Sequence, residues 1–302
     1  MDAATAAIPV FLNANAGRSA ADPHELRRNL GCNRIRVEQI PAAALAERVR
    51  AEADAGTPIV GIAGGDGTMS TAATVLAGTA TVLLCVPTGT INSFANRIGI
   101  PDVPAAAEAL KAGRTCTAVI GALDNAVFLN TVTLGEYARV VRMRERLRAY
   151  LGKWPAAAVA FATTLVSARM ITLTLQTGDV ALTRRTPFVW IGIGWGSFPR
   201  VPHAAERRAS PDLEVAIMRH AGTAAAASFL FRVGTRVARG QNASDDRQLD
   251  VLHTGSLTID AAHRIDATVD GETLRLVPPL RIGLHQAGLR VFTGPSSRVT
   301  GT

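Results

Sequence analysis

The segment Gly64-Gly65-Asp66-Gly67-Thr68 has the residue types of a phosphate-binding turn. It follows an apolar run, Pro58–Ala63, and precedes a helix expected from Met69. Glycines let backbone N–H groups approach an anion closely, and a helix N-terminus adds a positive dipole end. A carboxylate beside phosphates, here Asp66, implies a bridging metal ion or a donor such as ribose. The turn is not a Walker A loop, because no Lys-Ser/Thr pair follows, and a plain strand-to-helix turn capped by Asp66 is the alternative.

Two further polar loops are expected at the same edge of the sheet. An apolar run, Thr81–Val86, leads into Pro87-Thr88-Gly89-Thr90-Ile91-Asn92, and the first apolar run of the chain is followed by Asn13. Parallel strands end at a common edge, so these loops could close on one nucleotide. The alternatives are helix capping by Thr90 and Asn92 and an ordinary turn after the first strand.

Another candidate, Asp270-Gly271-Glu272, lies between the apolar runs Ile265–Val269 and Thr273–Val277. It offers two carboxylates at a tight turn. Asp-Gly between apolar runs is also the commonest short hairpin turn, so a purely structural role is the alternative.

The pattern of elements predicts an α/β N-terminal domain followed by a β-rich domain. Apolar runs alternate with helical stretches from residue 8 to about 114, which is typical of βαβ units and a parallel sheet. Short antiparallel strands then flank a long helical stretch, Glu136–Ser167, broken at Gly152 and Pro155. The strands expected are Ile8–Leu12, Arg34–Val37, Pro58–Ala63, Thr81–Val86, Cys116–Leu123, Ala126–Val132, Ile171–Gln176, Pro187–Ile193, Leu213–Met218, Ser256–Ile259, Ile265–Val269, Arg281–Leu284 and Leu289–Phe292. The helices expected besides that stretch are Pro23–Leu30, Pro41–Ala55, Met69–Leu76, Ser93–Ile98, Val103–Ala112 and Ala224–Arg239.

Composition favours a two-domain protein with anionic partners. The chain has 302 residues and a formal charge of +8, carried by arginine because Lys111 and Lys153 are the only lysines. Membrane surfaces, nucleic acids and phosphorylated cofactors all suit this charge, and an arginine-rich genome is the alternative explanation. Three scattered cysteines indicate a reducing compartment, and the N-terminus lacks the features of a signal peptide. The most apolar later stretch, Trp154–Val166, is too short to cross a bilayer.

A basic stretch from Arg139 to Arg148 precedes this apolar segment. Its arginines alternate with Val140, Val141 and Leu147, so the stretch could dock on anionic lipid. A solvated helix with one buried side is an equal alternative.

The chain resembles a lipid kinase family in the order and spacing of three segments, the turns Gly64–Thr68 and Asp270–Glu272 and the loop Pro87–Asn92. This family includes diacylglycerol kinases, sphingosine kinases and YegS-like bacterial kinases. Gly152-Lys153-Trp154 and Leu289-Arg290-Val291-Phe292 resemble its bacterial members. The first turn alone is shared with NAD kinases, so the combination carries the resemblance.

The resemblance implies an enzyme that transfers the γ-phosphoryl group of ATP to a lipid hydroxyl. Residues 1–118, with 286–302 returning to them, would form the nucleotide-binding α/β domain, and 119–285 the β-rich, sandwich-like lipid domain, with the active site in the cleft between them. Asp270 would be the general base, with Glu272 beside it. The residues implied to hold ATP are Asn13, Gly64, Gly65, Asp66, Gly67, Thr68, Thr90 and Asn92, and those implied to hold Mg²⁺ are Asp66 and Glu214.

Two segments depart from the family pattern. Many members have Asn-Asp-Phe-Ala where this chain has Asn92-Ser93-Phe94-Ala95, and the metal-associated Asp-Gly-x-Leu-Asp segment is here Ser210-Pro211-Asp212-Leu213-Glu214. These losses put an accessory magnesium site in doubt and leave open a lipid-binding or regulatory protein that has lost catalysis. The first turn shared with NAD kinases leaves open a second alternative, a kinase of a soluble substrate.

The resemblance also implies a lipid substrate and a cytoplasmic protein peripheral to the inner face of the membrane, with no nucleic-acid partner. The sequence leaves the particular lipid and the oligomeric state open, with a homodimer as one option.

Overall fold

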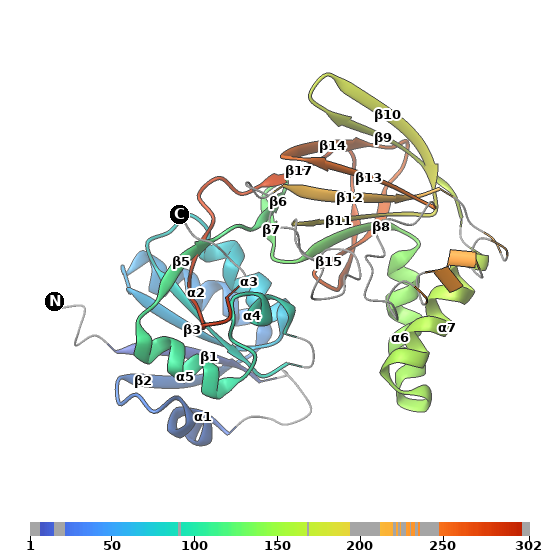
Figure 1. Ribbon diagram of the computed structural model, residues 1–302. Coiled ribbons are helices and arrows are strands. Elements are labelled where there is room, and N and C mark those ends of the chain that lie inside the picture. The colour runs from blue at the N-terminus through green and yellow to red at the C-terminus, as the bar shows by residue number, and fades with distance from the viewer. Residues whose placement is uncertain are drawn as a thin grey trace. The chain divides into compact units, whose positions relative to one another are not determined.

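The computed structural model describes residues 7–14, 22–89, 92–167, 169–193, 212–219 and 248–297, with isolated positions between 222 and 235. The chain divides into two compact units (Figure 1). Unit 1 consists of Met1–Ile120, Ala126–Leu129 and His285–Thr302, and unit 2 consists of Gly121–Asn125 and Asn130–Leu284.

Unit 1 is built on a six-stranded sheet in the order β2-β1-β3-β4-β18-β5. Strands β1 to β4 are parallel to their neighbours, β18 pairs parallel with β4, and β5 runs antiparallel to β18. The strands are β1 (Ile8–Asn13), β2 (Ile35–Ile40), β3 (Ile59–Gly64), β4 (Val82–Pro87), β5 (Thr115–Ala118) and β18 (Leu289–Phe292). The order reverses between β1 and β3, and in such sheets ligands bind beyond the carboxyl ends of the strands at this point.

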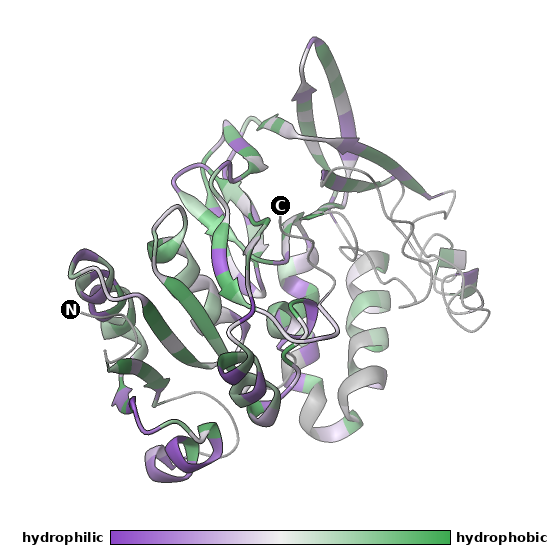
Figure 2. Cartoon of the chain, turned by 60° about the vertical axis from the view of Figure 1, so that its left-hand side comes forward, coloured by the Kyte–Doolittle hydropathy of each residue, from purple (hydrophilic) through white to green (hydrophobic). Residues whose placement is uncertain are grey.

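Helices cover both faces of this sheet, with α1 and α5 on one side and α2 and α3 on the other (Figure 1). Helices α1 and α5 begin at N-caps whose carboxylates accept backbone N–H groups, Asp22 from His24 and Asp102 from Ala105. All residues of β4 are buried, as expected for a strand covered on both faces, and Figure 2 shows the apolar strands between the helices. The helices are α1 (Pro23–Leu30), α2 (Leu45–Asp54), α3 (Asp66–Leu76), α4 (Ser93–Arg97) and α5 (Val103–Ala112), with a short 3₁₀ helix at Ala42–Ala44.

Unit 2 contains two antiparallel sheets. One has the order β10-β9-β14-β17-β6-β7 and the other β13-β12-β11-β8-β15-β16. The strands are β6 (Gly121–Leu123), β7 (Ala126–Phe128), β8 (Thr131–Gly135), β9 (Ile171–Thr177), β10 (Val180–Thr186), β11 (Phe188–Ile193), β12 (Leu213–Met218), β13 (Leu249–Thr254), β14 (Ser256–Asp260), β15 (Ile265–Val269), β16 (Glu272–Leu276) and β17 (Leu280–Leu284). Two antiparallel helices, α6 (Tyr137–Leu151) and α7 (Lys153–Val166), follow β8.

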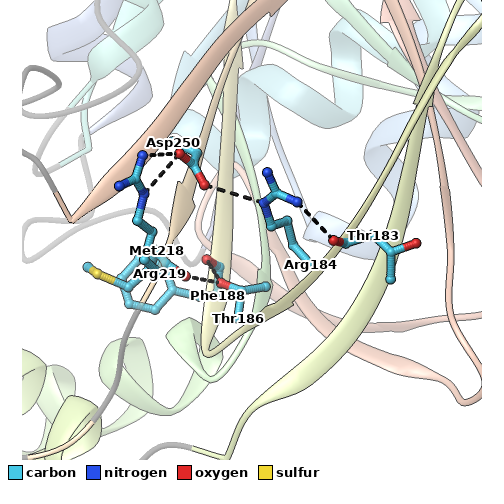
Figure 3. Close-up of polar contacts among 7 residues, drawn as sticks. All are labelled: Thr183, Arg184, Thr186, Phe188, Met218, Arg219 and Asp250. Carbon is cyan, nitrogen blue, oxygen red and sulfur yellow. Dashed lines mark hydrogen bonds and ion pairs between the residues drawn. The ribbon is translucent and has the colours of Figure 1, made fainter.

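One carboxylate ties the two sheets of unit 2 together (Figure 3). Asp250 on β13 accepts hydrogen bonds from Arg219, at the end of β12, and from Arg184 on β10, at 3.4 Å. Burial opposes the charged form of Asp250, but the hydrogen bonds and charges of the two guanidinium groups outweigh it and hold the pKa of this carboxyl below its usual 3.8. Nearby, the buried Thr186 hydroxyl donates to the carbonyl of Met218 at 2.6 Å.

The structure confirms the predicted fold class, with a mostly parallel α/β unit and a β-rich second unit. The single strands expected over Cys116–Leu123 and Ala126–Val132 are wrong, because each covers two strands that belong to different sheets, β5 and β6 in the first and β7 and β8 in the second. Two strands were missed, β10 and β13, whose residues are mostly exposed or half-buried. The helix expected at Ala224–Arg239 falls largely outside the described residues. Among those residues, no helix has the length and apolar run needed to cross a membrane.

Candidate functional site

The β3–α3 turn is so tight that its first position requires glycine. A Cβ built on Gly64 would lie 2.5 Å from the Thr68 Cβ, whereas carbon atoms normally meet at about 3.5–4.0 Å. Gly65 is the N-cap residue of α3, which begins at Asp66, and none of the described side chains caps this helix end. Within the described part of the chain, the first-turn N–H groups of α3 therefore have no side-chain acceptor, and the helix dipole favours an anion there.

The β4–α4 loop lies directly against this turn. A Cβ on Gly89 would lie 2.5 Å from the Cα of Gly65, so the two backbones touch where both residues are glycine. Thr88 N–H donates to the Gly64 carbonyl at 3.1 Å. Asn92 adopts a left-handed conformation, and its side chain both donates to the Gly89 carbonyl and accepts from the Gly89 N–H. Thr90 lies outside the described residues.

Asp66 connects the two loops. Its carboxylate accepts the backbone N–H groups of Ser93 at 3.0 Å and Phe94 at 3.1 Å, so it caps α4 across 27 residues of sequence. The alternative role of Asp66 as a cap of its own helix is wrong, because Gly65 occupies that position. Each carboxylate oxygen keeps a lone pair beyond these bonds, which leaves Asp66 able to accept a further donor or bind a cation.

A third loop joins the first turn at the point where the strand order reverses. Asn13, the last residue of β1, donates from Nδ2 to the Thr68 hydroxyl at 3.0 Å. Strands β1 and β3 are neighbours in the sheet, so this bond spans the position where ligands bind in open α/β sheets.

Beneath the loops, burial and then the charge of Asp66 raise the pKa of the Cys85 thiol, which favours a core role over nucleophilic chemistry.

In unit 2, Asp270 forms the turn between β15 and β16. Asp270 and Gly271 both have positive φ angles, 48° and 94°, as a two-residue hairpin turn requires. Asp270 Oδ1 accepts the N–H groups of Asn130 at 2.7 Å and Thr131 at 3.0 Å, which fixes the turn to the start of β8. Glu272 is exposed at the start of β16.

Glu214 lies on β12, where it is opposite Gly192 of β11 and His253 of β13. Only 1% of its surface is exposed. Oδ2 of Asp212 lies 3.6 Å from Nδ1 of His253. Within the ranges given above, no three His, Cys, Asp or Glu side chains group as a metal site. Ser210 and Pro211 of the metal-associated segment lie outside those ranges.

The structure thus gathers Asn13, the Gly64–Thr68 turn and Asn92 at one edge of unit 1, and it places Asp270, Glu272 and Glu214 in unit 2. The sequence-based site omitted Gly89, although its place in a Pro-x-Gly-Thr run could have indicated a close approach of two backbones. It also omitted the Ser93 and Phe94 amides, which no side-chain pattern marks.

Comparisons with known proteins identify a matching family model and similar folds. Residues 7–123 match the family model described as the diacylglycerol kinase catalytic domain. A crystal structure of a diacylglycerol kinase from Bacillus anthracis str. Sterne aligns with a TM-score of 0.68 and 15% identity over 96% of this chain and 97% of its own. A second structure from that organism, of a protein assigned as a diacylglycerol kinase, gives a TM-score of 0.75 and 18% identity over 96% and 98%. At these identities the likeness shows the fold. A search of curated proteins found no match.

Proposed function

The chain belongs, through residues 7–123, to the diacylglycerol kinase catalytic domain family, and from this premise we propose that it transfers the γ-phosphoryl group of ATP to a lipid hydroxyl. The observation that carries the proposal is the meeting of three loops at the carboxyl edge of the unit 1 sheet. Two of them touch through Gly65 and Gly89, and the Asn13–Thr68 hydrogen bond joins the third.

The β3–α3 turn is proposed to hold the ATP phosphates. Its open N–H groups and the α3 dipole suit an anion, and the glycines let phosphate oxygens come close to the backbone. Asn13 and Asn92 would act mainly by holding the loops in position, since both side chains already bond to neighbouring loop atoms. Thr90 is proposed to complete the pocket, as the family resemblance implies.

Asp270 is proposed as the general base. The lipid hydroxyl oxygen attacks the γ-phosphorus, the bond to the β-phosphate oxygen breaks, ADP leaves, and the hydroxyl proton passes to the Asp270 carboxylate. Two backbone N–H groups bind one oxygen of that carboxylate, Oδ1, and hold the group in a fixed orientation. Glu272, exposed beside it, is proposed to add negative charge near the accepted proton.

A divalent cation fits this proposal at Asp66, whose carboxylate oxygens are the hard ligands that Mg²⁺ prefers and retain unused lone pairs. When bound, Mg²⁺ would neutralise charge on the β- and γ-phosphates. Glu214 is proposed as an accessory ligand on the family resemblance alone, because the described residues around it form no metal cluster.

Labelling with γ-³²P-ATP tests the function directly. The chain is incubated with Mg²⁺ and a mixed lipid extract, and radioactivity in the organic phase is measured; pure diacylglycerol, sphingosine and phosphatidylglycerol then identify the acceptor. Asp66→Ala is expected to lower labelling about a hundredfold, by the scale typical of losing one electrostatic contact to the transition state. Asp54→Ala, which removes an exposed carboxylate at the end of α2, is the matched control and should label like wild type.

Label in the organic phase supports the proposal. Transfer of label to NAD, with none in the organic phase, would replace it by a kinase of a soluble substrate. Absence of label from every acceptor, with nucleotide binding retained, would identify a protein that has lost catalysis. The proposed setting is cytoplasmic, at the inner face of the membrane.

A further inference from the structure

Helices α6 and α7 form a hairpin whose turn, at Gly152, lies at the end remote from the sheets of unit 2 (Figure 1). The other end is anchored by aromatic contacts. The ring of Tyr137 lies 5.0 Å from that of Trp190, and the ring of Phe161 lies 5.8 Å from that of Phe188. This anchoring accounts for the base of the hairpin, whereas the described tip residues Tyr150 and Leu151 are exposed.

A basic stripe runs along α6 toward the tip. Helix α6 carries five arginines and one glutamate. Arg139, Arg142 and Arg146 are exposed and spaced three and four residues apart, so they lie on one face of the helix. The next position on that face is Tyr150, whose surface is 86% exposed.

Helix α7 presents an apolar stripe beside the basic one. Val159 and Val166 are 41% and 45% exposed, and Leu151 at the turn is 45% exposed. Two side-chain contacts between the helices place the stripes on the same side of the hairpin. Arg139 donates to the Ser167 hydroxyl at 3.0 Å, and the Thr163 hydroxyl lies 2.9 Å from the sulfur of Met143.

We propose that this side and tip of the hairpin form a docking surface for an anionic phospholipid bilayer. The surface consists of Arg139, Arg142, Arg146, Tyr150, Leu151 and Val159. Arginines are drawn to anionic head groups, tyrosine favours the boundary between head groups and acyl chains, and the aliphatic residues enter that boundary. The excess of positive charge over the length of α6 selects a negatively charged surface over a neutral one. The inference deepens the proposed function and rests on it, since a lipid kinase must reach an acceptor held in a bilayer.

Flotation with vesicles tests the surface without any reaction. The full chain is mixed with vesicles of phosphatidylcholine alone or of phosphatidylcholine and phosphatidylglycerol in equal parts, in 0.1 M NaCl. Each arginine near an anionic surface strengthens binding by roughly fivefold. Arg142→Glu with Arg146→Glu removes two arginines and adds two negative charges, so it should weaken binding to the anionic vesicles by at least about 25-fold. Arg185→Glu with Arg264→Glu changes the net charge equally at exposed sites elsewhere in unit 2 and should leave binding unchanged.

The apolar tip is tested in the same assay. Tyr150→Ser with Leu151→Ser should lower binding to anionic vesicles at least fivefold, and the loss should persist in 0.5 M NaCl, where surface charge is screened. The matched control is Val180→Ser with Leu274→Ser, which removes exposed apolar side chains from strands β10 and β16. Circular dichroism would check that each variant keeps its helices.

Three results would overturn the inference: wild type that ignores anionic vesicles, hairpin variants that bind like wild type, or controls that lose binding equally. Hairpin variants that change the oligomeric state but not vesicle binding would also overturn it and assign the surface to contact between copies. Kinase activity on detergent-dispersed lipid separates the two proposals. Vesicle binding without activity leaves docking standing and ends the proposed function, and activity without vesicle binding does the reverse.

Discussion

Gly89→Ala tests the contact between the two phosphate loops. The added Cβ would lie 2.5 Å from the Cα of Gly65 and 2.7 Å from Oδ1 of Asn92. Carbon atoms pack at about 3.5 Å or more, so the loops must separate by roughly 1 Å. That movement would displace the β3–α3 turn from Asn92 and disturb the capping of α4 by Asp66.

The expected effect on nucleotide chemistry is larger than the effect on stability. A displacement of about 1 Å in a positioning loop can cost about a hundredfold in rate, which corresponds to roughly 2.7 kcal/mol of transition-state stabilisation. Adding one methyl group to a closely packed site costs about 1–3 kcal/mol of folding free energy. Movement of the loops lowers that cost. The variant should therefore stay folded at 25 °C while kcat/KM for ATP falls about a hundredfold.

The assay combines steady-state phosphorylation, binding of a fluorescent ATP analogue and thermal unfolding. Gly255→Ala is the control, because a Cβ at that position meets nothing within 4 Å. It should change none of the three measurements. If Gly89→Ala keeps kcat/KM and nucleotide affinity within threefold of wild type, the loops do not position the phosphates and the reasoning is refuted.

Three further substitutions test the remaining parts of the argument. Asp270→Asn keeps an oxygen that can accept the Asn130 and Thr131 N–H groups, so kcat should fall at least tenfold with nucleotide affinity and Tm unchanged; wild-type turnover would remove the base from the mechanism. Asn13→Ala should raise the Kd for nucleotide severalfold and, in a double-mutant cycle with Thr68→Val, show a coupling of about 1 kcal/mol, while additive effects would contradict the hydrogen bond. Because the pKa of Asp250 is lowered by Arg219 and Arg184, its stabilisation is present above pH 3.8 and lost as pH falls further, so the Tm difference between wild type and Asp250→Asn should shrink below pH 3.8. A difference that stays constant would rule out that ion pair as its source.

The order of elements in unit 1 could be predicted because each strand is a short apolar run closed by Gly or Pro. Strand β4, buried at every residue, is the clearest example. Strand β10 could not be predicted on that basis, because it lies at a sheet edge and only Thr186 among its residues is buried. The break between β5 and β6 depends on pairing with strands far along the chain, which local pattern does not encode.

The site was predictable as a set of loops but not as a set of contacts. The positions of the glycine-rich turn and of Asn13 follow from where strands end. The capping of α4 by Asp66 depends instead on two loops meeting in space, 27 residues apart in sequence. For Asp270, the hairpin turn was readable from Asp-Gly, whereas its bonds to Asn130 and Thr131 join residues about 140 positions apart.

The strongest sign of function in unit 1 is the arrangement of polar groups at the start of α3. Asp66 stands in the first turn of α3, yet its carboxylate accepts the first N–H groups of α4, and among the described residues no side chain caps α3. Gly65 and Gly89 give up side-chain packing to bring two backbones together. Sequences break local rules in this way mainly at functional sites, and a bound phosphate would satisfy the same N–H groups that the fold leaves open.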